Sequence, residues 1–121
     1  MFALGTEADN VAPWRSVFKI HNLTDTDVTF ALTNGGHNQG IVSPPSRPGR
    51  HYRLALTRAD DPRPNPDDWM KSTRLEDGSW WPAWFSWLGA QSSASVDPPP
   101  MGRVEAGYPP LDPAPGDYVL G

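Results

Sequence analysis

The chain has 121 residues, no cysteine and a formal net charge of -4 at pH 7. The absence of cysteine excludes a disulfide framework, a thiolate metal site and a cysteine nucleophile within these residues. The acidic balance, with no basic stripe, argues against nucleic acid as a partner. With 15 prolines and 11 glycines, the chain has little room for long helices.

No apolar run approaches the length of a membrane span. The opening segment, Met1–Thr6, is apolar, but it is too short for the hydrophobic region of a signal peptide and lacks a basic flank. We therefore expect no membrane partner and a cytoplasmic location.

A strand, a short helix and a second strand are predicted within the first 33 residues. Phe2–Thr6 is a short apolar run that ends at glycine and threonine, which indicates a buried strand. Pro13 suits the first turn of a helix, and the apolar positions from Trp14 to about His21 fit one helical face. Val28–Thr33 is the second strand. Such a unit favours parallel strands joined by a right-handed crossover, and so an α/β fold.

Further elements are expected downstream. The alternation in His51–Leu56 indicates a strand or an extended edge segment. Asn65 can cap a short helix that begins at Pro66 and reaches about Ser72. Ser79 can cap a second helix, from Trp80 to about Gln91, whose aromatic residues have helical spacing. That spacing favours packing over a platform for sugars or prolines.

The composition divides the chain at about residue 91. Residues 1–91 carry the predicted strands and helices, and residues 92–121 are rich in serine, proline and glycine. We expect an extended tail whose tyrosines and leucines dock onto the body. Because two parallel strands do not make a sheet that stands alone, we expect the fold to be incomplete or completed by a partner chain.

Two side chains stand where a catalytic pair would stand. Asp9 directly follows the first strand, and His37 lies on a glycine-rich loop after the second. In a parallel sheet both positions fall at the carboxyl edge, where α/β enzymes build their sites. A carboxylate there can fix the tautomer of a catalytic imidazole. By pattern alone, however, an aspartate and a histidine in loops are as well explained as ordinary surface residues.

The order of the two residues matches one arrangement in particular. In α/β-hydrolases the nucleophile comes first, then the acid and then the histidine, so a nucleophile would have to precede Met1. The other histidines, His21 and His51, lack the acidic neighbours of a metal site.

Four segments, in order, resemble the polyhydroxyalkanoate synthases of the class I type, and the match runs over essentially the whole chain. The separation between Asp9 and His37 also agrees with that family. The segments are the acid-bearing Ala8–Ser16, the histidine loop in Phe30–Pro45, the Gly-Ser-Trp-Trp-Pro-Ala-Trp motif at Gly78–Trp84 and the closing segment Tyr108–Val119.

The resemblance implies a fragment from the C-terminal part of an α/β-hydrolase fold: its last parallel core strands with a crossover helix, then a Trp-rich helix and an extended tail. It implies an acyltransferase that polymerises 3-hydroxyacyl-coenzyme A through a Cys-His-Asp triad. His37 would be the general base, and Asp9 would orient it or help activate the monomer hydroxyl. The cysteine would lie upstream, so we expect this chain alone to be inactive.

The resemblance also carries expectations about partners. They are the upstream portion of the catalytic domain, in the same gene or as a separate chain, the acyl-coenzyme A substrate, the polyester granule and a second copy in a homodimer. No metal or resident cofactor is implied. Two positions depart from the family: Asn10 replaces a histidine beside the acid, and Gln39 replaces a small alanine after His37.

Two other interpretations stay open. A related α/β-hydrolase, such as a depolymerase or an esterase, would use the same acid and histidine, although the Trp-Trp motif favours the synthase. A Trp-rich module that binds granules or a synthase partner without catalysis is the alternative outside enzymes.

Overall fold

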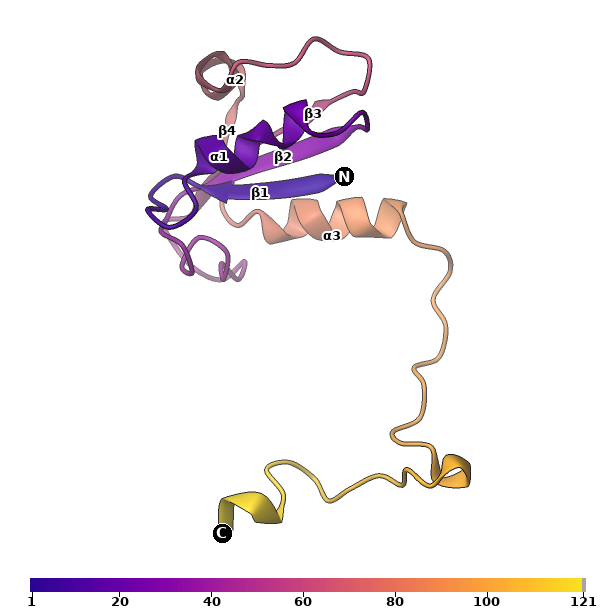
Figure 1. The fold of residues 1–121 in the computed structure, drawn as a ribbon. Helices are drawn as coiled ribbons and strands as arrows, with labels where there is room; N and C mark the ends of the chain where they lie inside the picture. Colours follow the sequence, from indigo (N-terminus) through magenta and orange to yellow (C-terminus); the bar gives the residue numbers. More distant parts are fainter. Residues whose placement is uncertain (121) are drawn as a thin grey trace.

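The sheet has four strands in the order β1-β2-β3-β4 (Figure 1). The computed structural model describes residues 1–120. The β1–β2 pair is parallel, as predicted, while β3 and β4 are added antiparallel. The strands are β1 (Phe2–Thr6), β2 (Val28–Thr33), β3 (His51–Thr57) and β4 (Leu75–Asp77).

The crossover between β1 and β2 forms the predicted helix in two parts. Helix α1 (Trp14–Phe18) continues directly into a 3-10 turn, Lys19–Asn22. Helix α2 (Pro66–Ser72) is confirmed with its cap, because the Asn65 side chain accepts hydrogen bonds from the first backbone N–H groups of the helix. Helix α3 (Trp81–Ala90) begins one residue later than predicted.

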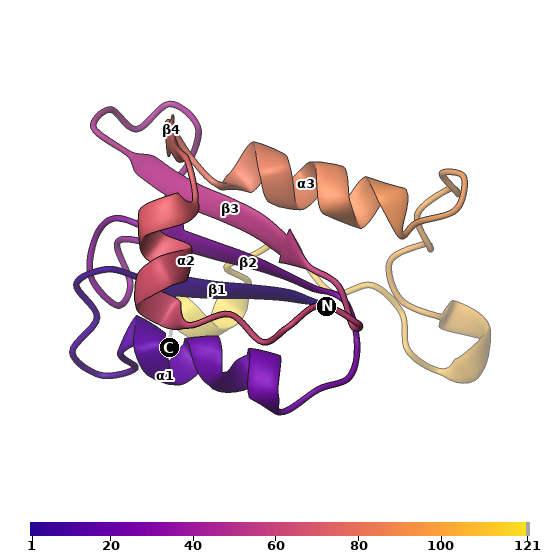
Figure 2. The same cartoon turned by 90° about the horizontal axis from the view of Figure 1, so that it is seen from above.

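Helices cover both faces of the sheet. Figures 1 and 2 show α1 and α2 on one face and α3 on the other. Alternate residues of β2 pack against the two helix layers, one formed by α1 and α2 and the other by α3, because successive side chains of a strand point to opposite faces. The α1–α2 layer has an aromatic core in which Phe18, Phe30 and Trp69 meet edge to face.

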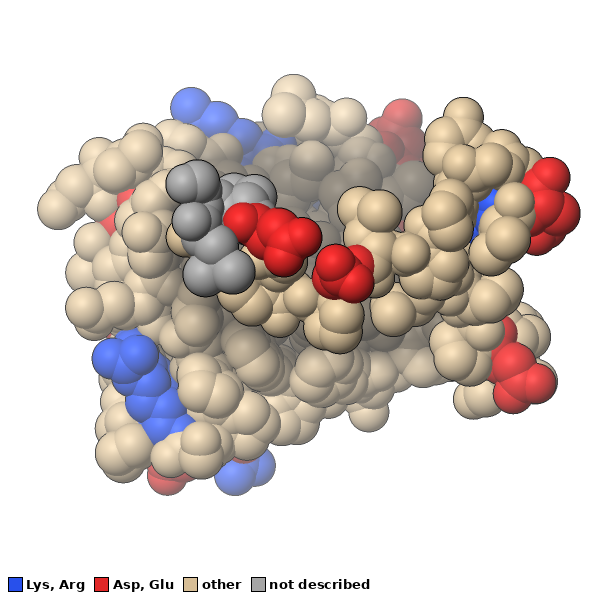
Figure 3. All heavy atoms as spheres, turned by 90° about the horizontal axis from the view of Figure 1, so that it is seen from below, with Lys and Arg blue, Asp and Glu red and all other residues tan. Residues whose placement is uncertain are grey.

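The second layer is also aromatic. The Phe2 ring lies 6.2 Å from the ring of Trp80 and 5.7 Å from that of Trp87, measured between centroids. Helix α3 contains no charged residue. Figure 3, seen from below, shows charged side chains of both signs scattered among mostly uncharged atoms. Phe85 on α3 is 55% exposed.

The sheet is larger than the two parallel strands on which the expectation of an incomplete fold was based. Strand β3 pairs along the whole of β2, and α3 covers the second face. The described sheet has two edge strands, β1 and β4, and no strand among residues 1–120 pairs with the outer edge of either. Strand β4 was not predicted, since three residues without apolar alternation give no strand pattern.

The tail leaves the body after α3 (Figure 1). Its only regular elements in the described part are the 3-10 turns Val104–Ala106 and Asp117–Leu120. The expectation that its tyrosines and leucines dock onto the body is wrong for Tyr108 and Leu111, which are exposed. Arg103 and Tyr108 exchange backbone hydrogen bonds with each other, so these backbone groups are paired within the tail itself. None of the helices in residues 1–120 is long and apolar enough to span a membrane.

We predict that Phe30→Ala lowers the free energy of unfolding by about 3 to 5 kcal/mol, because its side chain is fully buried among aromatic rings. Urea unfolding followed by tryptophan fluorescence measures the change. Phe85→Ala is the matched control, and a loss of about 1 kcal/mol or less is expected there because that ring is half exposed. Equal losses at the two positions would contradict the described core.

Candidate active site

The structure brings Asp9 and His37 together at the carboxyl edge of the parallel pair. His37 Nδ1 lies 2.8 Å from Asp9 Oδ2. Asp9 follows β1 in a turn, and His37 lies in the loop after β2, so the parallel register of the two strands sets both positions. The two residues are 28 positions apart in sequence.

The backbone of the same turn holds the Asp9 carboxylate in place, in addition to the contact with His37. Its Oδ1 accepts hydrogen bonds of 2.8 Å from both Val11 N–H and Ala12 N–H. The Ala12 hydrogen bond first, and the His37 hydrogen bond second, lower the pKa of Asp9 to about 2. The carboxylate is therefore ionised at neutral pH, although its side chain is only 7% exposed.

The ionised partner decides the tautomer of His37. A carboxylate can only accept, so Nδ1 of His37 is the nitrogen that carries the proton. In the neutral imidazole this leaves the lone pair on Nε2, which has no hydrogen-bond partner in the described part of the chain. The His37 side chain is 51% exposed, so this nitrogen is available to a reactant. Chemically, the pair can accept a proton at Nε2.

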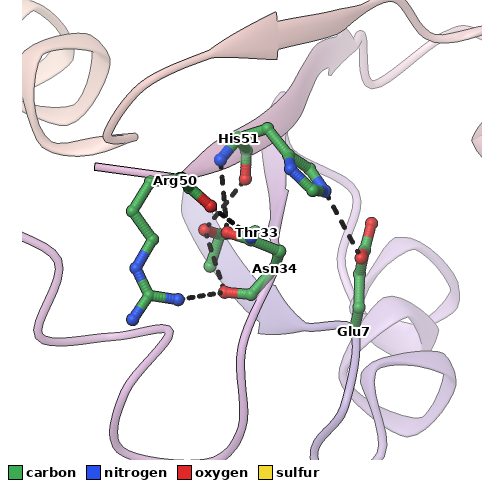
Figure 4. Close-up of polar contacts among 6 residues, drawn as sticks. Glu7, Thr33, Asn34, Arg50 and His51 are labelled. Atoms are coloured by element: carbon green, nitrogen blue, oxygen red, sulfur yellow. Dashed lines mark hydrogen bonds and ion pairs between the residues drawn. The ribbon is translucent and has the colours of Figure 1, made fainter. Parts of the chain in front are cut away.

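The loop that carries His37 starts at a tight junction with β3. The Asn34 side chain donates to Gly49 O at 2.9 Å and accepts from His51 N–H at 3.2 Å. Arg50 Nη1 donates to Asn34 O at 3.3 Å (Figure 4). Gly35 then takes φ +105°, and a side chain there would collide with the Arg50 guanidinium. These contacts fix where the loop leaves β2.

A second acid–histidine pair lies at the same edge. His51 Nε2 is 3.7 Å from Glu7 Oε2 (Figure 4). The sequence analysis considered His51 only as a metal ligand and did not anticipate this pair, which forms because β3 begins at His51 and brings it beside Glu7. The signal for finding the pair was that Glu7 directly follows the end of β1 and His51 begins the next predicted strand.

The remaining candidates have structural positions. His21 is buried, and its ring lies between those of Phe18 and Phe30. Asn10 and Gln39, the two departures from the synthase pattern, are exposed. Within residues 1–120, no group of three or more ligating side chains could hold a metal ion.

We predict that Asp9→Asn lowers stability near neutral pH, and that the difference from the parent shrinks as the pH falls from about 4 to about 2. The pKa of Asp9 is lower in the folded chain than in the unfolded chain, so the ionised carboxylate stabilises the fold at pH values above the unfolded-state pKa. This contribution is lost as the pH falls through the folded-state pKa. Asparagine keeps the Oδ1 that caps Val11 and Ala12, so the variant tests the charge. Thermal melts between pH 2 and pH 7 measure it, and a difference that is constant with pH would contradict the assigned pKa.

Comparison with curated proteins identifies relatives of this chain. It is 38% identical over 122 residues to poly(3-hydroxyalkanoate) polymerase 2 of Ectopseudomonas oleovorans, a match that covers 98% of this chain and 20% of that protein. It is 34% identical to the poly(3-hydroxyalkanoate) polymerase of Methylorubrum extorquens, where the match covers 98% of this chain and 19% of the relative. Searching family models gave no match. The chain spans about a fifth of the length of these curated relatives. It is therefore homologous to a segment of the poly(3-hydroxyalkanoate) polymerases, which confirms the resemblance found in its motifs.

Proposed function

We propose that this chain supplies the acid and the base of a polyhydroxyalkanoate synthase, with Asp9 and His37 as two members of a Cys-His-Asp triad. The observation that carries the proposal is the 2.8 Å contact between His37 Nδ1 and Asp9 Oδ2. These are the same two residues that the synthase motifs single out. Because the chain has no cysteine, the nucleophile belongs to a segment of the enzyme outside these 121 residues.

The proposed first step is transfer of an acyl group to the enzyme. His37 Nε2 accepts the proton of the cysteine thiol, and Asp9 stabilises the imidazolium that forms. The thiolate attacks the thioester carbonyl of 3-hydroxyacyl-coenzyme A, and the bond between that carbonyl and the sulfur of coenzyme A breaks. Coenzyme A takes the proton from Nε2 and leaves as the thiol, so the acyl group remains as a new thioester on the enzyme.

Chain growth repeats the same proton transfer with a different nucleophile. The 3-hydroxyl group of another acyl unit gives its proton to His37 Nε2 and attacks the carbonyl of the enzyme-bound thioester. An ester bond forms, the bond between the carbonyl carbon and the cysteine sulfur breaks, and the sulfur takes the proton from Nε2 to restore the thiol. Neither step requires a metal or a resident cofactor, and the coenzyme A arrives with the substrate.

The fold supports placing residues 1–91 within an α/β-hydrolase catalytic domain, with residues 92–121 as its tail. The parallel β1–β2 pair with its crossover helix is the kind of unit from which such domains are built. The outer edge of β1, which no described strand occupies, is where the sheet would continue into the rest of the enzyme. That rest, in the same or a separate chain, is the partner that this proposal requires.

We predict that the purified chain alone releases no coenzyme A from 3-hydroxybutyryl-coenzyme A, because no acyl-enzyme can form without the thiol. A thiol-reactive dye measures the released coenzyme A. Robust turnover by this chain would overturn the division of the triad.

We predict that grafting this chain in place of the matching segment of polymerase 2 of Ectopseudomonas oleovorans gives an active polymerase. In that chimera His37→Gln should lower kcat on the order of a million-fold, and Asp9→Asn about 10,000-fold. The matched control is His51→Gln, which removes a histidine at the same edge that contacts Glu7 instead of Asp9. Polymerisation that survives His37→Gln would refute the assignment of the base, and ester hydrolysis in place of polymer formation would favour the esterase interpretation.

A further inference from the structure

Three consecutive residues, Ser79 to Trp81, at the junction where α3 begins, donate hydrogen bonds to the loop that carries His37. The indole Nε1 of Trp80 donates to Gly40 O at 3.1 Å, and that of Trp81 donates to Ile41 O at 3.0 Å. The hydroxyl of Ser79 donates to the carbonyl of Ser43. This Ser-Trp-Trp segment lies about 40 positions further along the chain than the loop, so it connects two regions that the sequence keeps apart.

The Trp80 contact is buried and tightly packed. Trp80 is 6% exposed, and Gly40 is buried as well. A side chain at Gly40 would overlap the side chain of Thr6, so this part of the loop lies directly against the end of β1. The Trp80 ring is itself held between Phe2 on β1 and Trp84 on α3. Its N–H is therefore a donor in a fixed position, and losing it would leave a buried carbonyl without its partner.

The Gly40 peptide connects this contact to the histidine. Gly40 N–H donates to Gly36 O at 2.9 Å, which closes a turn that contains His37. The same residue offers its carbonyl to Trp80. The donor Trp80, the residue directly before α3, thus fixes the closing residue of the turn from which the imidazole projects.

We propose that Trp80 is a positioning residue for His37: its indole N–H holds the Gly36–Gly40 turn so that His37 Nδ1 faces the Asp9 carboxylate. This inference rests on the proposed function, since it assigns to Trp80 the orientation of the base named there. It also assigns the Trp-Trp motif a role beyond packing, because its indole N–H groups donate hydrogen bonds to the loop.

The alternative is that Trp80 serves only to fill space between β1 and α3. Trp80→Phe removes the donor and part of the ring, while replacing Trp80 by β-(3-benzothienyl)alanine keeps the ring shape and removes only the N–H. The matched control is Trp84→Phe, in the first turn of α3. Its ring packs against those of Trp80 and Phe85, and its indole makes no hydrogen bond to the described residues.

The test reads the tautomer of His37 by long-range proton–nitrogen NMR on the complete chain, at a pH where the imidazole is neutral. The signals are identified by their loss in His37→Gln, and amide dispersion verifies that each variant is folded. We expect the proton on Nδ1 in the parent and in Trp84→Phe. In both Trp80 variants we expect most His37 side chains to carry the proton on Nε2 instead of Nδ1. This is the tautomer that an imidazole without the carboxylate contact prefers. The pKa of Asp9 should also rise from about 2 toward its ordinary value.

The outcomes separate the inference from the proposed function. A parent chain without the Nδ1–H form would contradict the Asp9–His37 pair and with it the proposed function. A parent with that form, and Trp80 variants that keep it, would overturn the positioning role alone. An equal loss in Trp84→Phe would also overturn it, because the effect would then come from general packing along α3. The benzothienyl variant decides the question if Trp80→Phe does not fold.

Discussion

The parallel pairing of β1 with β2 is the constraint on which the site depends. Thr6 is opposite Thr33 in the register, so the two strands end together and their following loops start side by side. Asp9 comes three residues after the end of β1, and His37 comes four residues after the end of β2. A slip of one residue in this register would turn the core side chains of β2 to the wrong face. The aromatic core under α1 and α2 thus stabilises the same register that brings acid and histidine into contact.

The sequence predicted those parts of the fold whose signals are local. The strands β1 and β2 have compact apolar runs, and α2 has its asparagine cap and a proline at its first position. Strand β4 was missed because its existence depends on the edge of β3 and on no pattern of its own. The docking expected of Tyr108 and Leu111 was wrong because apolar residues alone do not indicate where, or whether, a segment packs against a surface; Tyr118 and Leu120 have side chains outside the described part.

The site was predictable to a similar degree and for the same reason. Asp9 and His37 could be placed at one edge from strand order, and their contact follows from the geometry; their catalytic roles stay predictions. The hydrogen bonds from Trp80 and Trp81 to the loop could not be found, because tryptophans at helical spacing indicate packing and give no sign of where the indole N–H groups point. The Glu7–His51 pair was missed because it depends on where β3 begins.

The capping contact at Asp9 has a consequence for how such a site can be assembled. The largest influence on the acid is the N–H of Ala12, three residues away in the same turn, and the histidine comes second. The carboxylate is thus held in position largely by a short stretch of its own backbone. This cap forms within residues 9–12 and needs no nucleophile. Evolution or an engineer could therefore exchange the cysteine-bearing portion, and the acid would already be in its capped position.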